Sequence, residues 1–401
     1  MKKQITIVGG GFSGLTLAYC LHKLGYEIRI YEKNQWGGLL QTQNMNGMYI
    51  EEAANAILWT PHLEELCKSI GCQLVSPLPQ ARNKWIWKNK LTRWPLGFVS
   101  SLKLVVFLLR FLFQRSTLKP LKGQTIQEWT LRHLNREILD YLVSPGLQGI
   151  YAGDPQKLSA SLILSSLFRK RTPKGGSVAP NKGMGELINQ LKNYLESHNI
   201  HFEIRDIQSL NEIQTPLVLA TSLNELLRLR PELNNEKLDF LNLVRVTTDF
   251  EKNTEHKMNG FGVLFPPNEK FNSLGALSNS DIFEFNQDNF NESWLMGGAH
   301  KQEVTELSER EIKNQVQADR LRALKDSTPF KNFFVKKHHH AYVHYDLHLE
   351  SWLNKNKDRL QEDSQLRWTT GNFLGKLGLS QILEQNLELA NRIYGVLCQK
   401  K

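Results

Sequence analysis

The chain has few cysteines, and their spacing forms no familiar pattern. The four are widely separated, without a Cys-x-x-Cys pair: Cys20, Cys67, Cys72 and Cys398. This number and spacing provide no disulfide framework, so the sequence indicates a reducing compartment. An apolar strand pattern begins at Ile5, so we expect no leader segment. We therefore expect exposure to the cytoplasm.

Acidic residues are in the minority, and the chain lacks a nucleic-acid-binding motif. The sequence has 50 Lys and Arg against 40 Asp and Glu, which gives a formal net charge of +10. Positive charge alone does not choose among nucleic acid, anionic lipid and a carboxylated ligand. The basic clusters alternate with apolar segments and form no basic tail. This arrangement favours a membrane surface or a carboxylated ligand, and we expect no nucleic-acid partner.

No long hydrophobic run is free of charge. The most apolar segment, 96–113, is interrupted by Lys103 and Arg110. A basic residue near the centre of a bilayer costs at least ~2.5 kcal/mol, which disfavours a membrane span. Basic residues seven apart lie near one face of a helix, so we expect a helix that dips into one leaflet. The alternative is a helix of the protein core in which both basic side chains snorkel to the surface.

The first 33 residues are typical of a dinucleotide-binding unit. An apolar strand runs into Gly9-x-Gly11-x-x-Gly14, a helical segment follows, and a second strand ends at Glu32. Gly9 permits the tight turn, Gly11 lets the backbone approach a pyrophosphate at the helix N-terminus, and Gly14 allows close packing. Glu32 is placed to accept hydrogen bonds from ribose hydroxyls. An acid here disfavours a 2′-phosphate, which leaves NAD or FAD.

The residues after Glu32 distinguish these two cofactors. The segment Glu32-Lys33-Asn34-Gln35-Trp36-Gly37-Gly38-Leu39-Leu40-Gln41-Thr42 resembles the FAD-dependent amine-oxidase and phytoene-desaturase superfamily. The resemblance implies FAD, with the glycine pair lying against the nucleotide. The superfamily usually has Arg where this chain has Leu39.

The middle of the chain narrows the resemblance. Glycines at 146, 149 and 153 between two prolines predict a backbone that bends sharply and approaches another group closely. The segment Gly149-Ile150-Tyr151-Ala152-Gly153-Asp154-Pro155-Gln156-Lys157-Leu158-Ser159 resembles a signature of the protoporphyrinogen oxidase family. Further matches follow the family's order: an aromatic hairpin at 82–95, a helix entry at 180–187, substrate-domain strands at 260–266 and 274–283, and a C-terminal flavin motif at 370–383.

The resemblance implies an α/β fold, which also suits a chain of 401 residues that is long enough for two domains. A Rossmann-like FAD domain would comprise 1–75, 176–240 and 355–401. A mixed-sheet substrate domain would comprise 76–95 and 241–354. A helical, membrane-associating subdomain would comprise 96–175.

The resemblance also assigns site residues. The implied FAD contacts are Gly9, Gly11, Phe12, Ser13, Gly14, Glu32, Lys33, Gly38, Leu39, Ile207, Gly371, Asn372 and Leu379. Lys84 would meet a substrate carboxylate, Gly149 would face the substrate ring through its backbone, and no residue is identified as a catalytic base. His340, His344 and His348 would share a helical face, but no carboxylate or thiol set completes the group, so we expect no metal.

Four departures from the family pattern bear on the substrate, and one of them is Lys84, which stands where many members have Arg in the aromatic hairpin. Ala53-Ala54 replaces a Gly-Pro pair after Glu51-Glu52, the expected Arg near Asn286 is absent, and 338–346 replaces a Pro-x-Tyr and Gly-His element. The expected reaction is hydride removal from a methylene bridge of protoporphyrinogen, with O2 or another acceptor reoxidising the flavin. The alternatives are coproporphyrinogen oxidation, another superfamily oxidase or desaturase, and a non-catalytic flavin-binding membrane partner.

Overall fold

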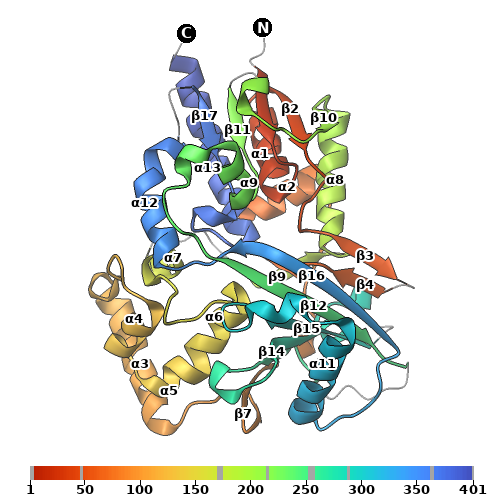
Figure 1. Ribbon diagram of the computed structural model, residues 1–401, viewed down its shortest axis with the longest axis vertical. Helices are drawn as coiled ribbons and strands as arrows, with labels where there is room; N and C mark the ends of the chain where they lie inside the picture. Colours follow the sequence, from red (N-terminus) through yellow and green to blue (C-terminus); the bar gives the residue numbers. More distant parts are fainter. Residues whose placement is uncertain are drawn as a thin grey trace.

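The computed structural model describes residues 4–45, 48–168, 175–213, 216–251, 258–286, 290–361 and 365–399. The fold is α/β, as predicted, with two main sheets and a group of helices beside them (Figure 1). The helices are α1 (Phe12–Lys23), α2 (Pro61–Ile70), α3 (Phe98–Phe113), α4 (Ile126–His133), α5 (Arg136–Ile138), α6 (Ser144–Tyr151), α7 (Ala160–Leu164), α8 (Met184–Ser197), α9 (Leu223–Leu229), α10 (Asn279–Ile282), α11 (Glu309–Leu324), α12 (Leu347–Gln361) and α13 (Leu379–Gln399).

The first sheet is parallel and has five strands in the order β10-β2-β1-β11-β17. Its strands are β1 (Gln4–Val8), β2 (Glu27–Glu32), β10 (His201–Ile204), β11 (Leu217–Leu219) and β17 (Arg367–Thr369). Apolar side chains of β1 and α1 are fully buried in one core, together with residues of α2, α8 and α13. The predicted order of strand, glycine turn, helix, strand and acid is confirmed.

The second sheet is mixed and has seven strands in the order β16-β12-β15-β14-β13-β7-β8. Its strands are β7 (Lys84–Lys88), β8 (Lys90–Thr92), β12 (Phe240–Asp249), β13 (Gly262–Leu264), β14 (Ser273–Ser278), β15 (Asn291–Gly297) and β16 (Asn332–Val343). Val244 and Val246 of β12 share a buried core with Ile312 and Val316 of α11, which covers one face of the sheet. Strand residues alternate between faces, so Leu243, Arg245 and Thr247 point away from α11.

The predicted hairpin at 82–95 is confirmed. β7 and β8 pair antiparallel around Asn89, whose φ of 59° suits the tight turn. Short strands complete the structure: β3 (Thr42–Met45) pairs with β4 (Met48–Glu51), and β9 (Ser177–Pro180) lies between β5 (Ile57–Leu58) and β6 (Leu74–Val75).

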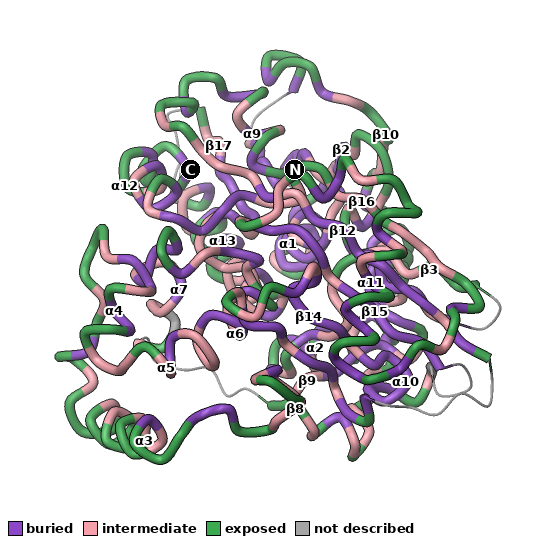
Figure 2. Tube along the Cα trace, turned by 60° about the horizontal axis from the view of Figure 1, so that its bottom comes forward, coloured by how far each residue is buried: buried purple, intermediate pink, exposed green. Residues whose placement is uncertain are grey.

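Helix α3 lies at the surface of the helical group (Figure 2). Ser100 is its only buried residue, whereas Phe98 and Phe113 are 85% and 83% exposed. The alternative of a buried core helix is therefore wrong. Among the described residues, the structure contains no helix with the length and apolar character needed to cross a membrane.

One local prediction is also wrong. His340 belongs to β16 and His348 to α12, with His344 between these elements, so the three histidines share no helical face. A β-bulge near Leu241 and the pairing of β16 with β12 override the helical spacing. The sharp bend predicted for the glycine-rich segment is present at Ala152, whose φ is 47°, directly after α6 (Ser144–Tyr151). The predicted close approach is also present, because a Cβ atom on Gly153 would lie 2.5 Å from Leu158.

Candidate cofactor and substrate site

The glycine turn after β1 has the geometry that a pyrophosphate requires. Gly9 has φ +112°, and a Cβ atom on Gly14 would lie 1.9 Å from the Gly9 carbonyl oxygen. These positions therefore exclude a side chain. No side chain caps the N-terminus of α1, and its first turn, which includes Phe12 and Ser13, has no acidic residue. The amide groups of this first turn can therefore bind an anion at the N-terminus of the helix.

Glu32 is fixed at the end of β2 by backbone donors. Its carboxylate accepts from the Gly10 amide at 2.7 Å and from the Asn34 amide at 2.9 Å. Each oxygen keeps a further lone pair, which a ribose hydroxyl can use. Lys33 forms ion pairs with Asp206 at 3.3 Å and Glu225 at 3.9 Å.

The glycine pair at 37–38 closes over this turn. Gly37 forms a β-bridge with Gly11, and a Cβ atom on Gly38 would meet the Gly11 Cα at 3.5 Å. Trp36, which the sequence analysis did not identify, fills the space beside Gly10 and packs edge-on against Phe202. Its neighbour Leu39 remains 45% exposed.

The C-terminal glycine loop begins at the same sheet edge. β17 runs parallel to β11, which runs parallel to β1, so their carboxyl ends meet at one edge of the sheet. Gly371 has φ +156° and Gly375 has φ +82°, and α13 begins at Leu379. The Tyr345 hydroxyl donates to the Asn372 carbonyl oxygen and holds this loop.

Asn386 links the two glycine segments through hydrogen bonds. It is fully buried in α13 and donates to the Ser13 carbonyl oxygen at 2.8 Å and to the Thr16 hydroxyl at 2.7 Å. Its own side-chain oxygen accepts from the Thr370 hydroxyl at 2.6 Å. One side chain therefore fixes α13 and the C-terminal loop against α1. The arrangement fits a dinucleotide that lies across both glycine segments.

Ile207 lies beyond β10 and is only 2% exposed, in the same apolar cluster as Tyr31. The contact of Ile207 with adenine stays a prediction. The same holds for the direct FAD contacts of the other residues predicted from the sequence.

Strand β13 brings the two predicted substrate residues to the same part of the second sheet. Lys84 pairs in register with Gly262, and its ammonium lies 5.4 Å from the centre of the Phe261 ring. Gly149 faces Leu264, since a Cβ atom on Gly149 would lie 2.8 Å from a methyl of that leucine. Lys84 is exposed and takes part in no ion pair among the described residues.

A buried polar cluster lies on the sheet face opposite α11. Arg245 donates to the Ala53 carbonyl oxygen, to Asn55 Oδ1 and to the Ser293 hydroxyl. The Asn279 amide donates to Asn291 at 2.7 Å and to Ser293 at 2.8 Å. The cluster links β12 and β15 to the loop after β4.

Burial changes the ionisation of two groups here. Burial raises the pKa of Glu51 to about 7, although the Met184 amide and the Thr42 hydroxyl donate to its carboxylate. Burial lowers the pKa of Arg245 to about 10, and the charge of Glu51 opposes that shift. Arg245 therefore stays positive at neutral pH, whereas Glu51 is partly protonated.

The histidine region contains a small group of possible metal ligands. Asp239, His344 and Asp346 each bring a ligand atom within 4.8 Å of the others, and His344 Nδ1 lies 3.4 Å from an Asp346 oxygen. The carboxylates that the sequence analysis did not find thus lie near His344. Three candidate ligands alone do not define a metal site, and the absence of a metal stays a prediction.

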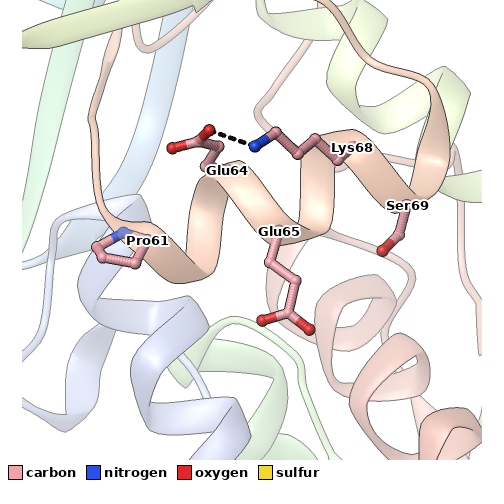
Figure 3. Close-up of a pocket in the computed structure, with 5 residues that line it drawn as sticks. All are labelled: Pro61, Glu64, Glu65, Lys68 and Ser69. Atoms are coloured by element: carbon pink, nitrogen blue, oxygen red, sulfur yellow. Dashed lines mark ion pairs between the residues drawn. The ribbon is translucent and has the colours of Figure 1, made fainter.

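One surface hollow lies on α2, away from these residues (Figure 3). It is lined by Pro61, Glu64, Glu65, Lys68 and Ser69, and Figure 3 shows the ion pair between Glu64 and Lys68. None of these residues belongs to the cofactor segments or to the polar cluster, so the hollow has no part in the site.

Comparison with known proteins identifies the class of the chain. The model of the flavin containing amine oxidoreductase family matches residues 12–208. Protoporphyrinogen oxidase 2 of Arabidopsis thaliana is 24% identical, over 98% of this chain and 94% of its own length. The mitochondrial protoporphyrinogen oxidase of Nicotiana tabacum is also 24% identical, over 98% and 95%. Coproporphyrinogen III oxidase of Bacillus subtilis is 28% identical over 39% of this chain and 38% of its own.

Solved structures show the same fold. A protein described provisionally as a protoporphyrinogen oxidase from Exiguobacterium sp. 255-15 superposes with a TM-score of 0.76 at 16% identity, covering 98% of this chain and 99% of its own. A putrescine oxidase variant gives 0.76 at 13% identity, covering 98% and 100%. Three observations point to a flavin-dependent oxidoreductase: the glycine segments, the similarity to relatives along almost the whole chain, and the shared fold. The chain is an FAD-dependent oxidoreductase, and it is similar to the flavin containing amine oxidoreductases and to the protoporphyrinogen oxidases.

Proposed function

We propose that this protein oxidises protoporphyrinogen IX to protoporphyrin IX. The observation that carries the proposal is similarity to plant protoporphyrinogen oxidases along almost the whole chain. The segment 149–159 resembles the family signature, and its Gly149 packs against β13 of the second sheet. We call this seven-stranded sheet the substrate sheet, because in this proposal it holds the substrate. The signature and the sheet that would hold the substrate are thus in direct contact.

The residues present suit a reaction that needs little acid–base catalysis. Bound FAD supplies a hydride acceptor. Removal of hydride from a methylene bridge leaves a positive charge that the adjacent pyrroles stabilise, so the protein mainly positions the macrocycle. Lys84 lies at the edge of the substrate sheet, where its ammonium can pair with a propionate. The acceptor that reoxidises the flavin is O2 or another oxidant.

The test is an assay with the purified flavoprotein. Protoporphyrinogen IX is added without oxygen while the flavin absorbance is followed, and air is then admitted while porphyrin fluorescence is followed. We expect flavin bleaching and then repeated turnover. Faster reaction with coproporphyrinogen III would assign that substrate instead, a candidate favoured by the partial similarity to the Bacillus subtilis enzyme. Bound FAD that neither porphyrinogen reduces would overturn the proposal.

We further infer that α3 contacts the inner face of the cell membrane without crossing it. Its exposed apolar side chains are Phe98, Val99, Leu102, Val105, Val106, Leu108, Leu109, Leu112 and Phe113. Lys103 and Arg110 are exposed on the same helix, where they can meet anionic headgroups. Contiguous apolar exposure of this extent is typical of an interaction surface.

A further inference from the structure

Arg245 is the most unusual charged group near the proposed site. Its side chain is only 8% exposed, and it points to the sheet face opposite α11. The guanidinium uses three donor contacts, to Ala53, Asn55 and Ser293. A guanidinium has five N–H donors, and the Nε donor of Arg245 has no partner.

Among the described residues, no carboxylate is in direct contact with Arg245, since none has an oxygen within ion-pair distance of the guanidinium. Its neighbours in the cluster are neutral: Asn55, Asn279, Asn291, Ser293 and Thr247. Glu51 lies near enough for its charge to favour the charged guanidinium, but it forms no ion pair with Arg245, and burial leaves it partly protonated at neutral pH. The next acid, Glu52, is paired with Lys336 at 2.8 Å. A buried charge is costly without a partner, so an unpaired one indicates that a ligand brings the opposite charge.

The loop that Arg245 holds leads directly to the flavin motif. Arg245 binds the loop at Ala53, whose side chain is exposed, and at Asn55. Five residues after Ala53, the Leu58 carbonyl oxygen accepts from the Ser380 hydroxyl in the first turn of α13. The positive charge therefore lies one short loop away from the C-terminal flavin segment, on the side of the substrate sheet.

We propose that Arg245 determines the charge of the substrate, favouring a molecule that carries a carboxylate and disfavouring a protonated amine. The inference rests on the proposed placement of the substrate between the flavin segments and the second sheet. A buried positive charge repels an ammonium group strongly where the dielectric constant is low, and it attracts a carboxylate for the same reason. The site of this chain is thereby suited to acidic lipophilic substrates.

The experiment measures binding separately from turnover. The FAD-loaded protein is titrated with protoporphyrin IX and with its dimethyl ester, and quenching of protein fluorescence is followed. We expect the diacid to bind the unaltered protein at least tenfold more tightly than the ester. Arg245→Met should reduce that ratio below about threefold, whereas Arg245→Lys should keep most of it. Decylamine should compete with the porphyrin more strongly in Arg245→Met than in the unaltered protein.

Arg230→Met is the matched control. Arg230 is buried like Arg245, but it is paired with Glu232 at 2.8 Å and lies outside the cluster. This variant should keep the diacid preference, even if its melting temperature falls. In turnover assays, Arg245→Met should raise KM with kcat changed less than about twofold.

The outcomes separate the two proposals. If the unaltered protein binds diacid and ester equally, or if Arg245→Met keeps the preference, the assignment of Arg245 is wrong even when porphyrinogen is oxidised. If the preference depends on Arg245 but neither porphyrinogen is oxidised, the charge selection stands and the proposed reaction is wrong. The ester comparison needs no variant, so equal binding of diacid and ester overturns the assignment even if Arg245→Met does not fold. Because Lys84 can also pair with a propionate, a diacid preference that persists in Lys84→Ala supports Arg245, and one that is lost there overturns it.

Discussion

Glu51 shows how the fold sets the charge of a single residue. The carboxylate is buried beside the start of α8, where the Met184 amide donates to it. Burial favours its neutral form and raises its pKa to about 7. The contribution of Glu51 to the free energy of unfolding therefore depends on whether the pH lies below or above this pKa.

Replacing Glu51 by Gln should change how stability depends on pH. The native pKa is about 7 and lies above the unfolded value. The native state therefore binds more protons between about pH 4.5 and 7, and its stability falls as pH rises through that window. Glu51→Gln removes this loss, which amounts to at most about 3 kcal/mol from the size of the shift. Denaturant unfolding at pH 5, 6, 7 and 8 measures it.

The comparison for Glu51 is Glu64→Gln. Glu64 pairs with Lys68 on the surface of α2, which lowers its pKa. This variant should show the same pH slope between 5 and 8 as the unaltered protein. Equal slopes for Glu51→Gln and the unaltered protein would contradict the raised pKa.

Lys84→Ala should affect substrate binding more than chemistry. Loss of one exposed charge contact should raise KM for protoporphyrinogen about tenfold, or ~1.4 kcal/mol, with kcat nearly unchanged. Steady-state kinetics measures both constants. Lys90→Ala is the control, because Lys90 is equally exposed but lies on β8, beyond the hairpin turn. A loss of kcat with unchanged KM would refute a binding role for Lys84.

At the scale of elements, α3 illustrates how a surface helix is held without burying its apolar residues. Glu137 accepts from Lys88 at 2.6 Å and from the Gly97 amide at 3.2 Å, and Ser100 also donates to it. These hydrogen bonds, the one from Lys88 foremost, lower the pKa of Glu137 to about 2. The start of α3 is therefore fixed to β7, while the rest of the helix faces outward.

Acidic substitutions on α3 should weaken the binding of the protein to lipid vesicles. We expect the unaltered protein to sediment with vesicles that contain anionic lipid, and the double variant Leu112→Glu, Phe113→Glu to remain in the supernatant. Each large apolar side chain contributes about 1.5–3 kcal/mol when it is buried, so binding should fall at least tenfold. Leu321→Glu on α11, which alters another half-exposed leucine, should bind as before. Equal sedimentation of all three proteins would exclude α3 as the contact.

At the scale of the whole molecule, the cofactor site depends on segments from both ends of the chain. The glycine turn follows β1, the C-terminal loop follows β17, and Asn386 connects α13 to α1. The fully buried Asn386 has three polar partners, which would be left unsatisfied if it were removed. Each buried polar group without a partner costs about 1–3 kcal/mol.

Asn386→Ala should therefore weaken FAD retention. We expect the Kd for FAD, measured by reconstitution of the apoprotein, to rise at least tenfold, and the gain in Tm on FAD addition to shrink. Asn391→Ala on the exposed face of the same helix is the control and should match the unaltered protein. An unchanged Kd for Asn386→Ala would show that the two segments keep their positions without this link.

Features set by residues close together in the chain were predicted correctly, whereas features set by residues far apart in the chain were not. The glycine turn after β1 was predicted correctly because Gly9 and Gly14 exclude side chains through contacts a few residues away. The hairpin at Asn89 was predicted for the same reason, since a local turn and alternation define it. The prediction that His340 and His344 share a helical face was wrong, because pairing with β12 makes the segment around His340 a strand.

The sequence by itself determined the cofactor class and the order of the elements. Glycine conformation, strand alternation and the acid at Glu32 act over short stretches of chain. Only the tertiary structure revealed the polar cluster, because Arg245 lies 192 residues from its partner Ala53. It also decided that α3 is exposed rather than buried, since an apolar helix pattern does not specify what covers it. Charges and surfaces depend on neighbours that are distant in sequence.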